Sequence, residues 1–200
     1  MKAKQWFPVL YMFIVTAIVS SVIIGMTLAT RERVKANETL ALEEAVLRVL
    51  PGQYTAGMSG AQIHSRFAEN VSEPSARTGG AWAVKQNGII QDYAVPLAGQ
   101  GFWAPIKGVI GVASDKKTVT GIAFYEQNET PGLGAEIAKP SWQAQFDGKK
   151  LSGSGKALLM KRPGEPLGAH DVHAVTGATQ TSIRLERIIN DCIAQWRSKL

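Results

Sequence analysis

Hydroxyl side chains gather around a Gly-Ala pair near the C-terminus, where residues 175–182 read VTGATQTS. Residues 183–189 then show the apolar spacing of an amphipathic helix, so the hydroxyls lie where a helix begins. Thr and Ser are common N-caps, and Gly-Ala-Thr alone is compatible with plain capping. The alternative is that one of these hydroxyls carries an attached group. The candidate residues of this stretch are Thr176, Gly177, Ala178, Thr179, Thr181 and Ser182.

Two further segments are turn-rich and apolar, and neither is needed to build a strand or a helix. They read GFWAPIKG over residues 101–108 and ETPGLGAEI over residues 129–137. In the second segment Pro131 fixes its own φ, and the glycines on both sides of Leu133 permit positive φ. Such a loop can press backbone amides and a leucine side chain against a flat ligand. A tight connection between a strand and a helix uses the same residues, and loop chemistry alone favours that connection.

The composition of the chain argues against several classes of function and of bound group. The chain has 200 residues and 45% apolar content, enough for one ordinary domain. Its net charge of +6 includes no run of five like charges, which argues against a nucleic-acid arm. The single cysteine, Cys192, excludes internal disulfides and cysteine-ligated iron-sulfur clusters. The three histidines form neither HExxH nor a helical i,i+4 pair, so a metal site is not predicted. Redox chemistry would need a bound organic cofactor.

An uncharged apolar stretch near the N-terminus predicts a transmembrane helix. Residues 7–29 carry no charge, and a helix of that length spans the roughly 30 Å hydrocarbon core of a bilayer. A cleaved signal peptide is the alternative, but its apolar region is shorter, about 7 to 15 residues, and ends in an A-x-A-like site. Basic residues flank the stretch on both sides, so the charge count does not decide its orientation. They are Lys2 and Lys4 before it, and Arg31, Arg33 and Lys35 after it.

The remaining pattern predicts an α+β domain. Residues 31–52 form an amphipathic helix that stops at a Pro-Gly pair, whereas residues 55–80 lack clear periodicity. Two hairpins follow, one around Asn87-Gly88 and one around residues 114–117, and give four strands. The last helix buries one stripe, and we expect the helices to pack on one face of the sheet. That stripe contains Leu185, Ile188, Ile189, Cys192, Ile193 and Trp196. The segment SGSGK lacks the GxxxxGK[ST] spacing and is interpreted as a turn.

Taken together, FYEQNETPGLGAEI, GFWAPIKG and TGAT resemble a known FMN-binding domain family. The family includes the C subunit of the sodium-translocating NADH:quinone reductase and the G subunit of the Rnf electron transport complex. The resemblance covers nearly the whole chain, and it implies three parts. Residues 1–30 would be a single transmembrane anchor, residues 31–52 a juxtamembrane amphipathic helix, and residues 53–200 an antiparallel-sheet FMN-binding domain. The family topology puts the N-terminus in the cytoplasm and the domain in the periplasm, at the bacterial inner membrane.

In this family a flavin transferase joins FMN through its phosphate to the threonine that ends [ST]GAT, which here is Thr179. A phosphodiester suits that place, because the N-terminus of a helix starting near Thr181 offers unpaired N–H groups and a positive dipole end. Thr176, Thr181 and Ser182 would add hydroxyl donors, while Gly177 and Ala178 leave Thr179 uncrowded. The resemblance also places five residues around the isoalloxazine ring, namely Glu129, Thr130, Gly132, Leu133 and Gly134. Trp103 is a further candidate for the same pocket.

One position departs from the family pattern. The family usually has an aspartate three residues before [ST]GAT, and this chain has His173 there, with Asp171 two residues earlier. If the transferase reads that acid, recognition would be weakened or shifted. The chain length is closer to the G subunit of Rnf, whereas FYEQNETPGLGAEI followed by SWQAQFDGKK is more similar to the C subunit of the quinone reductase. We favour the quinone reductase.

The resemblance implies an electron-transfer subunit of an ion-translocating oxidoreductase complex, carrying single electrons on covalent FMN without a substrate site of its own. Its partners would be other membrane subunits of the complex, the flavin transferase and the bilayer, and not nucleic acid. The alternatives are the G subunit of the Rnf complex, or a membrane-tethered scaffold whose flavin site is degenerate. A stand-alone flavin reductase would need a nicotinamide site, and no strand-flanked GxGxxG is present.

Overall fold

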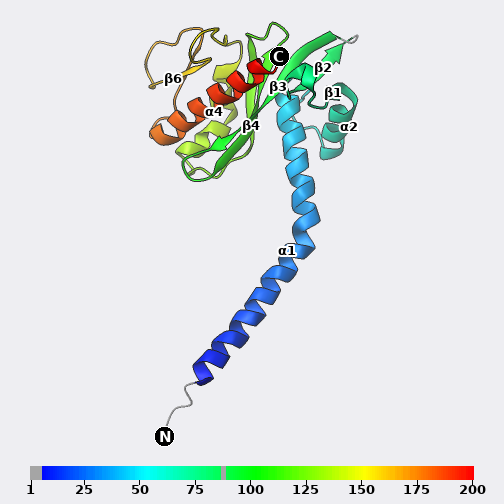
Figure 1. The fold of residues 1–200 in the computed structure, drawn as a ribbon, viewed down its shortest axis with the longest axis vertical. Helices are drawn as coiled ribbons and strands as arrows, with labels where there is room; N and C mark the ends of the chain where they lie inside the picture. The colour runs from blue at the N-terminus through cyan, green and yellow to red at the C-terminus, as the bar shows by residue number, and fades with distance from the viewer. Residues whose placement is uncertain (1–5, 87–88) are drawn as a thin grey trace. The chain divides into compact units, whose positions relative to one another are not determined.

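The computed structural model describes residues 6–86 and 89–200, and the chain divides into two units, residues 1–39 and residues 40–200. The first helix, α1 (Trp6–Val49), supplies the described part of the first unit and continues into the second (Figure 1). The prediction of a helix over residues 31–52 therefore falls on the C-terminal part of α1, which ends two residues before Pro51. Lys2 and Lys4 lie outside the described residues.

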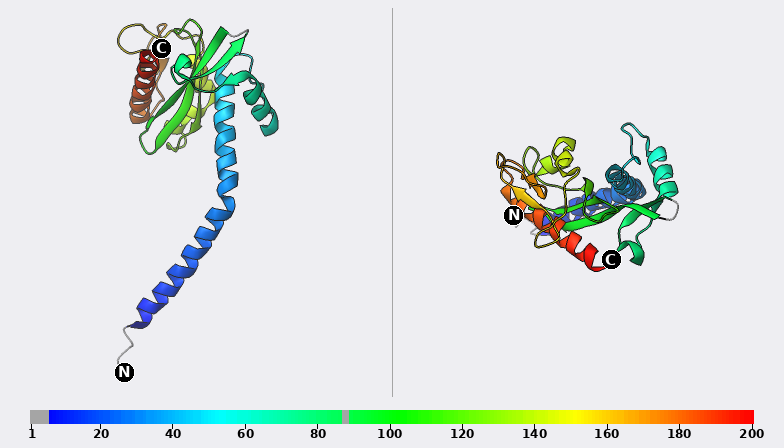
Figure 2. Two further views of the ribbon diagram at one scale, coloured as in Figure 1. Left: turned by 45° about the vertical axis from the view of Figure 1, so that its right-hand side comes forward. Right: turned by 90° about the horizontal axis from the view of Figure 1, so that it is seen from above.

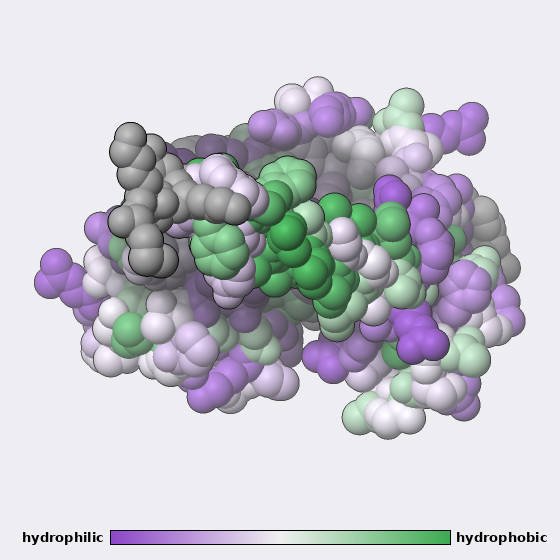
Figure 3. Space-filling view, turned by 90° about the horizontal axis from the view of Figure 1, so that it is seen from below, coloured by the Kyte–Doolittle hydropathy of each residue, from purple (hydrophilic) through white to green (hydrophobic). Residues whose placement is uncertain are grey.

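The N-terminal part of α1 is long and apolar enough to cross a membrane. Its large apolar side chains are exposed, and Figure 3 shows their green surfaces gathered together. The hydroxyls of this stretch bond within the helix: Ser21 donates to the Ala17 carbonyl at 2.7 Å, and Thr27 donates to the Ile23 carbonyl at 2.8 Å. Bonds of this kind satisfy hydroxyls where water is absent. By length, composition and these internal bonds, this part of α1 is suited to cross a bilayer.

The second unit is built on a five-stranded antiparallel sheet in the order β1-β2-β3-β4-β5. Four strands are the predicted ones: β2 (Trp82–Gln86), β3 (Ile89–Gln100), β4 (Pro105–Ala113) and β5 (Val119–Glu126). The pairing of Gln86 with Ile89 confirms the first hairpin, although Asn87-Gly88 itself lies outside the described residues. The two-residue β1 (Val71–Ser72) adds an edge strand that the sequence analysis did not predict.

Helical segments cover both faces of this sheet, so the expectation of one covered face is wrong. On one face α4 (Thr179–Ser198) packs against residues such as Tyr93, Val95, Leu97 and Ile110. On the other face, the end of α1 and helix α2 (Gly60–Asn70) pack against Ala94, Val109 and Ala123. Figure 2 shows α4 and α2 on opposite sides of the strands. Alternate residues of each strand point to opposite faces, which is why neighbours such as Ala94 and Val95 enter different cores.

Two glycines allow helices to come close to the sheet. A Cβ at Gly99 would lie 2.4 Å from Ile188 Cγ1 on α4, and a Cβ at Gly111 would lie 2.3 Å from the Val49 carbonyl oxygen. Thr120 Oγ1 on β5 donates to that same carbonyl at 2.6 Å. The last turn of α1 is therefore fixed to the sheet.

The second predicted hairpin is also confirmed, and a side chain holds its turn. Asp115 Oδ1 accepts from the backbone N–H groups of Lys117 and Thr118, both at 2.8 Å. The Thr118 hydroxyl donates to the other carboxylate oxygen. Together these donors lower the pKa of Asp115 to about 2, with the Thr118 hydroxyl the largest cause.

Between β5 and α4 the chain forms short elements instead of long ones. They are η2 (Gly134–Ala138), α3 (Pro140–Gln143), η3 (Ala144–Phe146), and the parallel pair β6 (Leu159–Lys161) and β7 (Asp171–His173). Phe146 and Ile137 anchor this region in the core under α4. Cys192 on α4 packs against the same core, and burial raises the pKa of its thiol. The predicted turn at SGSGK is present, with Ser152 Oγ donating to the Ser154 carbonyl at 2.8 Å.

Candidate functional site

A single buried carboxylate joins the three segments that the sequence analysis selected. Glu129 is only 5% exposed. Its Oε1 accepts from the N–H groups of Phe102 at 2.8 Å and Trp103 at 3.1 Å. Its Oε2 accepts from the Thr181 hydroxyl at 2.6 Å. Glu129 therefore ties the turn between β3 and β4, its own loop after β5 and the first turn of α4 into one site.

Two glycines make room for this carboxylate. A Cβ at Gly134 would lie 2.5 Å from Thr181 Oγ1 and 2.8 Å from Glu129 Oε2. A Cβ at Gly101 would lie 2.5 Å from Glu129 Oε1. Because all these contacts are shorter than real Cβ atoms make, only glycine fits at either position without a shift.

We expect Gly134→Ala to lower the free energy of unfolding by about 1–3 kcal/mol, the usual cost of overpacking a filled site. The added methyl group would push apart Thr181 and Glu129. The matched control is Gly153→Ala, because nothing lies within 4 Å of a Cβ at Gly153. Chemical denaturation of both variants measures the difference. Equal stability of the two variants would contradict the close approach at Gly134.

Helix α4 begins at Thr179, two residues before the predicted start near Thr181. Its N-cap is Ala178, which has no side chain to cap the helix. The first N–H groups of a helix have no preceding helical carbonyl to bond. The Thr179 side chain is exposed, and its hydroxyl has no hydrogen-bond partner in the part of the chain that the structure describes. An uncommitted hydroxyl thus lies beside uncapped N–H groups.

The neighbouring hydroxyls of α4 are used inside the protein. Thr181 is 3% exposed and donates to Glu129. Ser182 is equally buried, donates to the Ala178 carbonyl at 2.9 Å and accepts from Val175 N–H at 3.1 Å. The Ser182 hydroxyl therefore holds the TGAT turn against α4, and the Thr181 hydroxyl holds the loop of Glu129 there. Thr176 is exposed, like Thr179.

The loop of residues 130–133 lies against the TGAT turn. The Thr130 carbonyl accepts from Leu133 N–H and Ala135 N–H, both at 3.1 Å, and Gly132 takes a φ of 74°. A Cβ at Gly177, where φ is 76°, would lie 3.0 Å from Leu133 Cδ2. The leucine therefore rests on the glycine of TGAT. Residues that the sequence analysis expected to line one ligand do converge.

The contacts of Glu129 with Phe102, Trp103 and Thr181 form what we call the Glu129 junction. Exposed apolar side chains surround this junction. Leu133 is 43% exposed, Phe102 is 44% exposed and Trp103 is 67% exposed. The rings of Phe102 and Trp103 meet edge to face, with centroids 5.0 Å apart. Trp103 was a predicted site residue, whereas Phe102 was not. Apolar surface of this kind beside a buried polar junction fits a flat, partly apolar ligand.

A groove of about 470 Å³ adjoins the same turn. Its lining includes the predicted residues Gly132 and Thr176, together with His173, Lys139 and Trp142. The His173 ring lies 2.9 Å from the Glu165 carbonyl oxygen, through Nε2, and Trp142 Nε1 donates to the His173 carbonyl at 3.1 Å. His173, which stands where the family pattern usually has an aspartate, therefore lines the groove.

Asp171, the acid nearest to His173, is committed to the fold. Its Oδ2 lies 2.7 Å from Lys161 Nζ and accepts from Gly168 N–H at 2.7 Å. The hydrogen bond from Lys161, followed by that from Gly168, lowers the pKa of the Asp171 carboxyl below its usual range. With only 7% of its surface exposed, Asp171 does not present a carboxylate at the surface in place of the missing aspartate.

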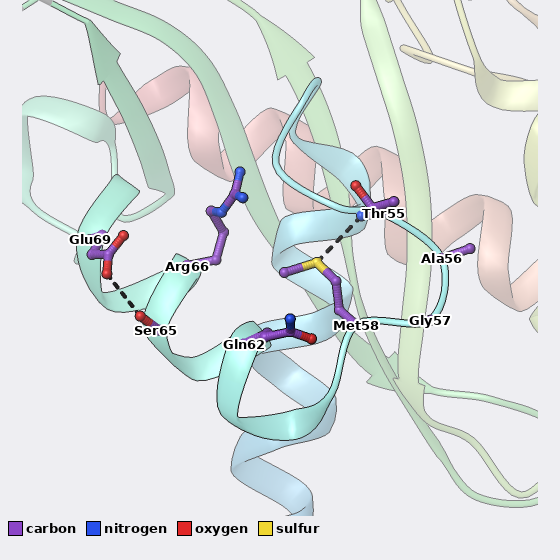
Figure 4. Close-up of a pocket in the computed structure, with 8 residues that line it drawn as sticks. All are labelled: Thr55, Ala56, Gly57, Met58, Gln62, Ser65, Arg66 and Glu69. Carbon is purple, nitrogen blue, oxygen red and sulfur yellow. Dashed lines mark hydrogen bonds between the residues drawn. The ribbon is translucent and has the colours of Figure 1, made fainter.

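Two other hollows of the second unit have linings that contain none of the predicted site residues. The larger of the two, about 500 Å³, lies between α2 and the loop before it (Figure 4). Arg66 on α2 lines it, and the two hydrogen bonds drawn there join Thr55 to Met58 and Ser65 to Glu69. A smaller hollow of about 240 Å³ lies beside Arg48 and Tyr125. The chemistry selected from the sequence therefore points to the Glu129 junction and not to these hollows.

Comparison with protein families gives a match at this site. Residues 101–194 match the model of a family described as an FMN-binding domain. The matched range begins in the turn that contacts Glu129 and ends near the end of α4. All three segments selected from the sequence lie within it.

Curated relatives share sequence with only part of the chain. The C subunit of Na(+)-translocating NADH-quinone reductase from Vibrio anguillarum is 44% identical over 110 residues, covering 54% of this chain and 43% of that protein. The protein of the same name from Pasteurella multocida is 35% identical over 128 residues, covering 62% of this chain and 45% of that protein. The chain thus spans under half the length of the curated relatives it matches.

Solved structures resemble the chain over most of its length. A crystal structure of the C subunit of Na(+)-translocating NADH-quinone reductase from Parabacteroides distasonis has a TM-score of 0.70 and 27% identity, covering 84% of this chain and 96% of that one. The crystal structure of Shewanella oneidensis NqrC has a TM-score of 0.67 at 21% identity, covering 83% of this chain and 98% of that one. The second likeness supports the fold alone. The α+β fold predicted from the sequence is thereby confirmed.

Proposed function

Because residues 101–194 match the FMN-binding domain family, we propose that this chain carries FMN as an electron-transfer subunit of a membrane-bound oxidoreductase complex. The observation that carries the proposal is the Thr179 hydroxyl, exposed and without a partner among the described residues, at the uncapped N-terminus of α4. A helix N-terminus favours a phosphate, because its N–H groups and dipole both complement negative charge. The FMN phosphate has the chemistry that this place accepts.

The proposal includes a covalent phosphoester bond at Thr179, made by a flavin transferase. Two structural facts support this choice of hydroxyl. Thr181 and Ser182 are buried and bonded within the protein, so attachment at either would first break a contact of the fold. Thr179 has no such contact to lose.

The residues around Thr179 would hold the rest of the cofactor. Leu133 and Trp103 offer exposed apolar surface for the ring, with Thr130 and Gly132 on the same loop as Leu133. Glu129 and Gly134 position that loop from beneath, because they are buried against Thr181. FMN, when bound, supplies the capacity to accept and release electrons, and the protein supplies attachment, orientation and local charge.

The choice of complex rests on the relatives. Proteins from Vibrio anguillarum, Pasteurella multocida and Parabacteroides distasonis all carry the name of the C subunit of Na(+)-translocating NADH-quinone reductase. We therefore propose an ion-translocating complex of this type, in preference to the Rnf complex, with other membrane subunits as partners. The domain itself would hold no site for a separate substrate.

The proposal places the chain as a single-pass protein of the bacterial inner membrane. Helix α1 is the anchor, since its N-terminal part is apolar and long enough to span a bilayer. The N-terminus would lie in the cytoplasm, and the chain that follows the anchor of residues 1–30 would lie in the periplasm. Covalent attachment suits that compartment, because a lost flavin could not readily be replaced there.

The test uses the full chain, produced in cells that contain the flavin transferase. We expect a fluorescent band on a denaturing gel, because only a covalent flavin survives denaturation. The tryptic peptide of residues 162–184 should gain the mass of an FMN phosphoester, and other membrane flavoproteins should co-purify. A colourless protein of unmodified mass would instead favour the scaffold with a degenerate flavin site.

A further inference from the structure

One cation near the Glu129 junction lacks a hydrogen-bonding partner. The Nε atom of Arg184 is buried and bonds no acceptor, and no carboxylate pairs with this side chain among residues 6–86 and 89–200. The Arg184 guanidinium carbon lies 6.0 Å from the centroid of the Phe102 ring. A buried donor without a partner costs stability, so proteins rarely keep one unless it serves a ligand or a water molecule.

The position of Arg184 on α4 directs it toward the candidate site. In an α-helix, residues three apart lie on the same face, so Arg184 shares the face of Thr181, which donates to Glu129. Helical side chains also lean toward the helix N-terminus. The Phe102 ring that Arg184 approaches belongs to the residue whose N–H bonds Glu129. Arg184 is thereby placed at the junction and not on the solvent side of the helix.

The same geometry separates Arg184 from the proposed phosphate. At about 100° per residue, Arg184 is rotated by about 140° around the helix axis from Thr179, but by only about 60° from Thr181. A phosphate on Thr179 already has the helix N–H groups as donors. The unpaired guanidinium is therefore better placed for a different part of the cofactor, next to Phe102.

We propose that Arg184 is a flavin contact, whose guanidinium donates to an acceptor atom of the isoalloxazine ring beside Phe102. This inference rests on the proposed function. A guanidinium is a permanent cation with a planar set of N–H donors, and it pairs well with ring carbonyl groups. Reduction adds electron density to the flavin ring, so a fixed positive charge there stabilises the reduced form more than the oxidised form. Arg184 would raise the reduction potential of the bound flavin.

The first test compares the flavin of the full chain with that of Arg184→Gln and Arg184→Lys. In Arg184→Gln, the preference of the protein for reduced over oxidised flavin should weaken by about tenfold, which lowers the reduction potential by about 30 mV for a two-electron couple. Arg184→Lys keeps the charge, so its reduction potential should fall by less than half as much. The matched control is Arg187→Gln, which removes the same charge from an exposed residue of the same helix and should leave the potential unchanged.

If the flavin has the same reduction potential in Arg184→Gln as in Arg187→Gln, the inference is overturned. If Arg184→Gln carries no flavin, the lysine variant decides. Flavin retained by Arg184→Lys would support a contact through charge, and flavin lost from both variants would show that Arg184 serves packing instead. A wild-type chain without flavin would refute the proposed function itself, which is a different result.

The second test needs no flavin. An unpaired buried donor contributes nothing to the flavin-free fold, so Arg184→Met should leave the Tm of the flavin-free protein unchanged or higher. The flavin-free protein is made in cells without the transferase. A clear fall in Tm would assign Arg184 to the fold and overturn its assignment to the flavin.

Discussion

Changing Thr179 to alanine should remove all covalently bound flavin and leave the domain folded. The Thr179 side chain is exposed and bonds nothing among the described residues, so its loss should change the free energy of unfolding by under about 0.5 kcal/mol. The loss of flavin should be complete, because the other hydroxyls in the first turn of α4, those of Thr181 and Ser182, are buried and bonded within the protein. Gel fluorescence measures the covalent flavin, and the mass of the peptide of residues 162–184 shows whether it is attached there. Thermal unfolding measures the stability of the variant.

Two neighbouring threonines provide the controls. Thr176→Ala changes an exposed hydroxyl two residues before the N-cap of α4 and should keep the flavin. Thr181→Ala removes the bond to Glu129 and should lower stability by about 1–2 kcal/mol, with the flavin still attached. If Thr176→Ala or Thr181→Ala removes the flavin and Thr179→Ala keeps it, the attachment residue is wrongly assigned.

The elements that local pattern specifies were predictable from the sequence. The four long strands show apolar runs bounded by turn residues, and the last helix shows a stripe at three- and four-residue spacing. The bounds of helix α2 were not predicted within residues 55–80, although its start carries a signal: Ser59 and Gln62 form a capping box, with Ser59 N–H donating to Gln62 Oε1 at 2.8 Å. An S-x-x-Q pattern is common enough that it did not stand out among small and polar residues.

Long-range contacts were beyond the reach of local pattern. Glu129 was predicted to line the flavin ring, and nothing in its loop indicates bonds to Phe102 and Thr181. Those bonds join residues separated by 27 and 52 positions, which only the assembled sheet and α4 bring together. The second covered sheet face was missed for a related reason. The sequence of Ala94, Val109 and Ala123 fits a half-buried face equally well, and the end of α1 together with α2 completes its burial.

Replacing Glu129 with alanine should lower the free energy of unfolding by about 3 kcal/mol, the largest stability loss that we expect at this site. The substitution leaves the N–H groups of Phe102 and Trp103 and the hydroxyl of Thr181 without their acceptor. Because Glu129 is 5% exposed, water can replace these bonds only if the loop opens. Glu129→Gln keeps an oxygen for the two N–H groups and an amide for the hydroxyl, so its loss should be about 1 kcal/mol.

The matched control is Glu136→Ala, seven residues later. Glu136 pairs with Lys139 at 2.6 Å, but the lysine side chain is 60% exposed, and surface pairs contribute at most about 1 kcal/mol. A double-mutant cycle sharpens the comparison, because Glu129→Ala and Thr181→Ala remove the same bond and should not add. Since Glu129 also positions the loop of Leu133, its alanine variant should hold the flavin more loosely, seen as stronger quenching of flavin fluorescence by iodide. If Glu129→Ala unfolds at the same denaturant concentration as Glu136→Ala, and its effect adds to that of Thr181→Ala, the carboxylate does not join the three segments.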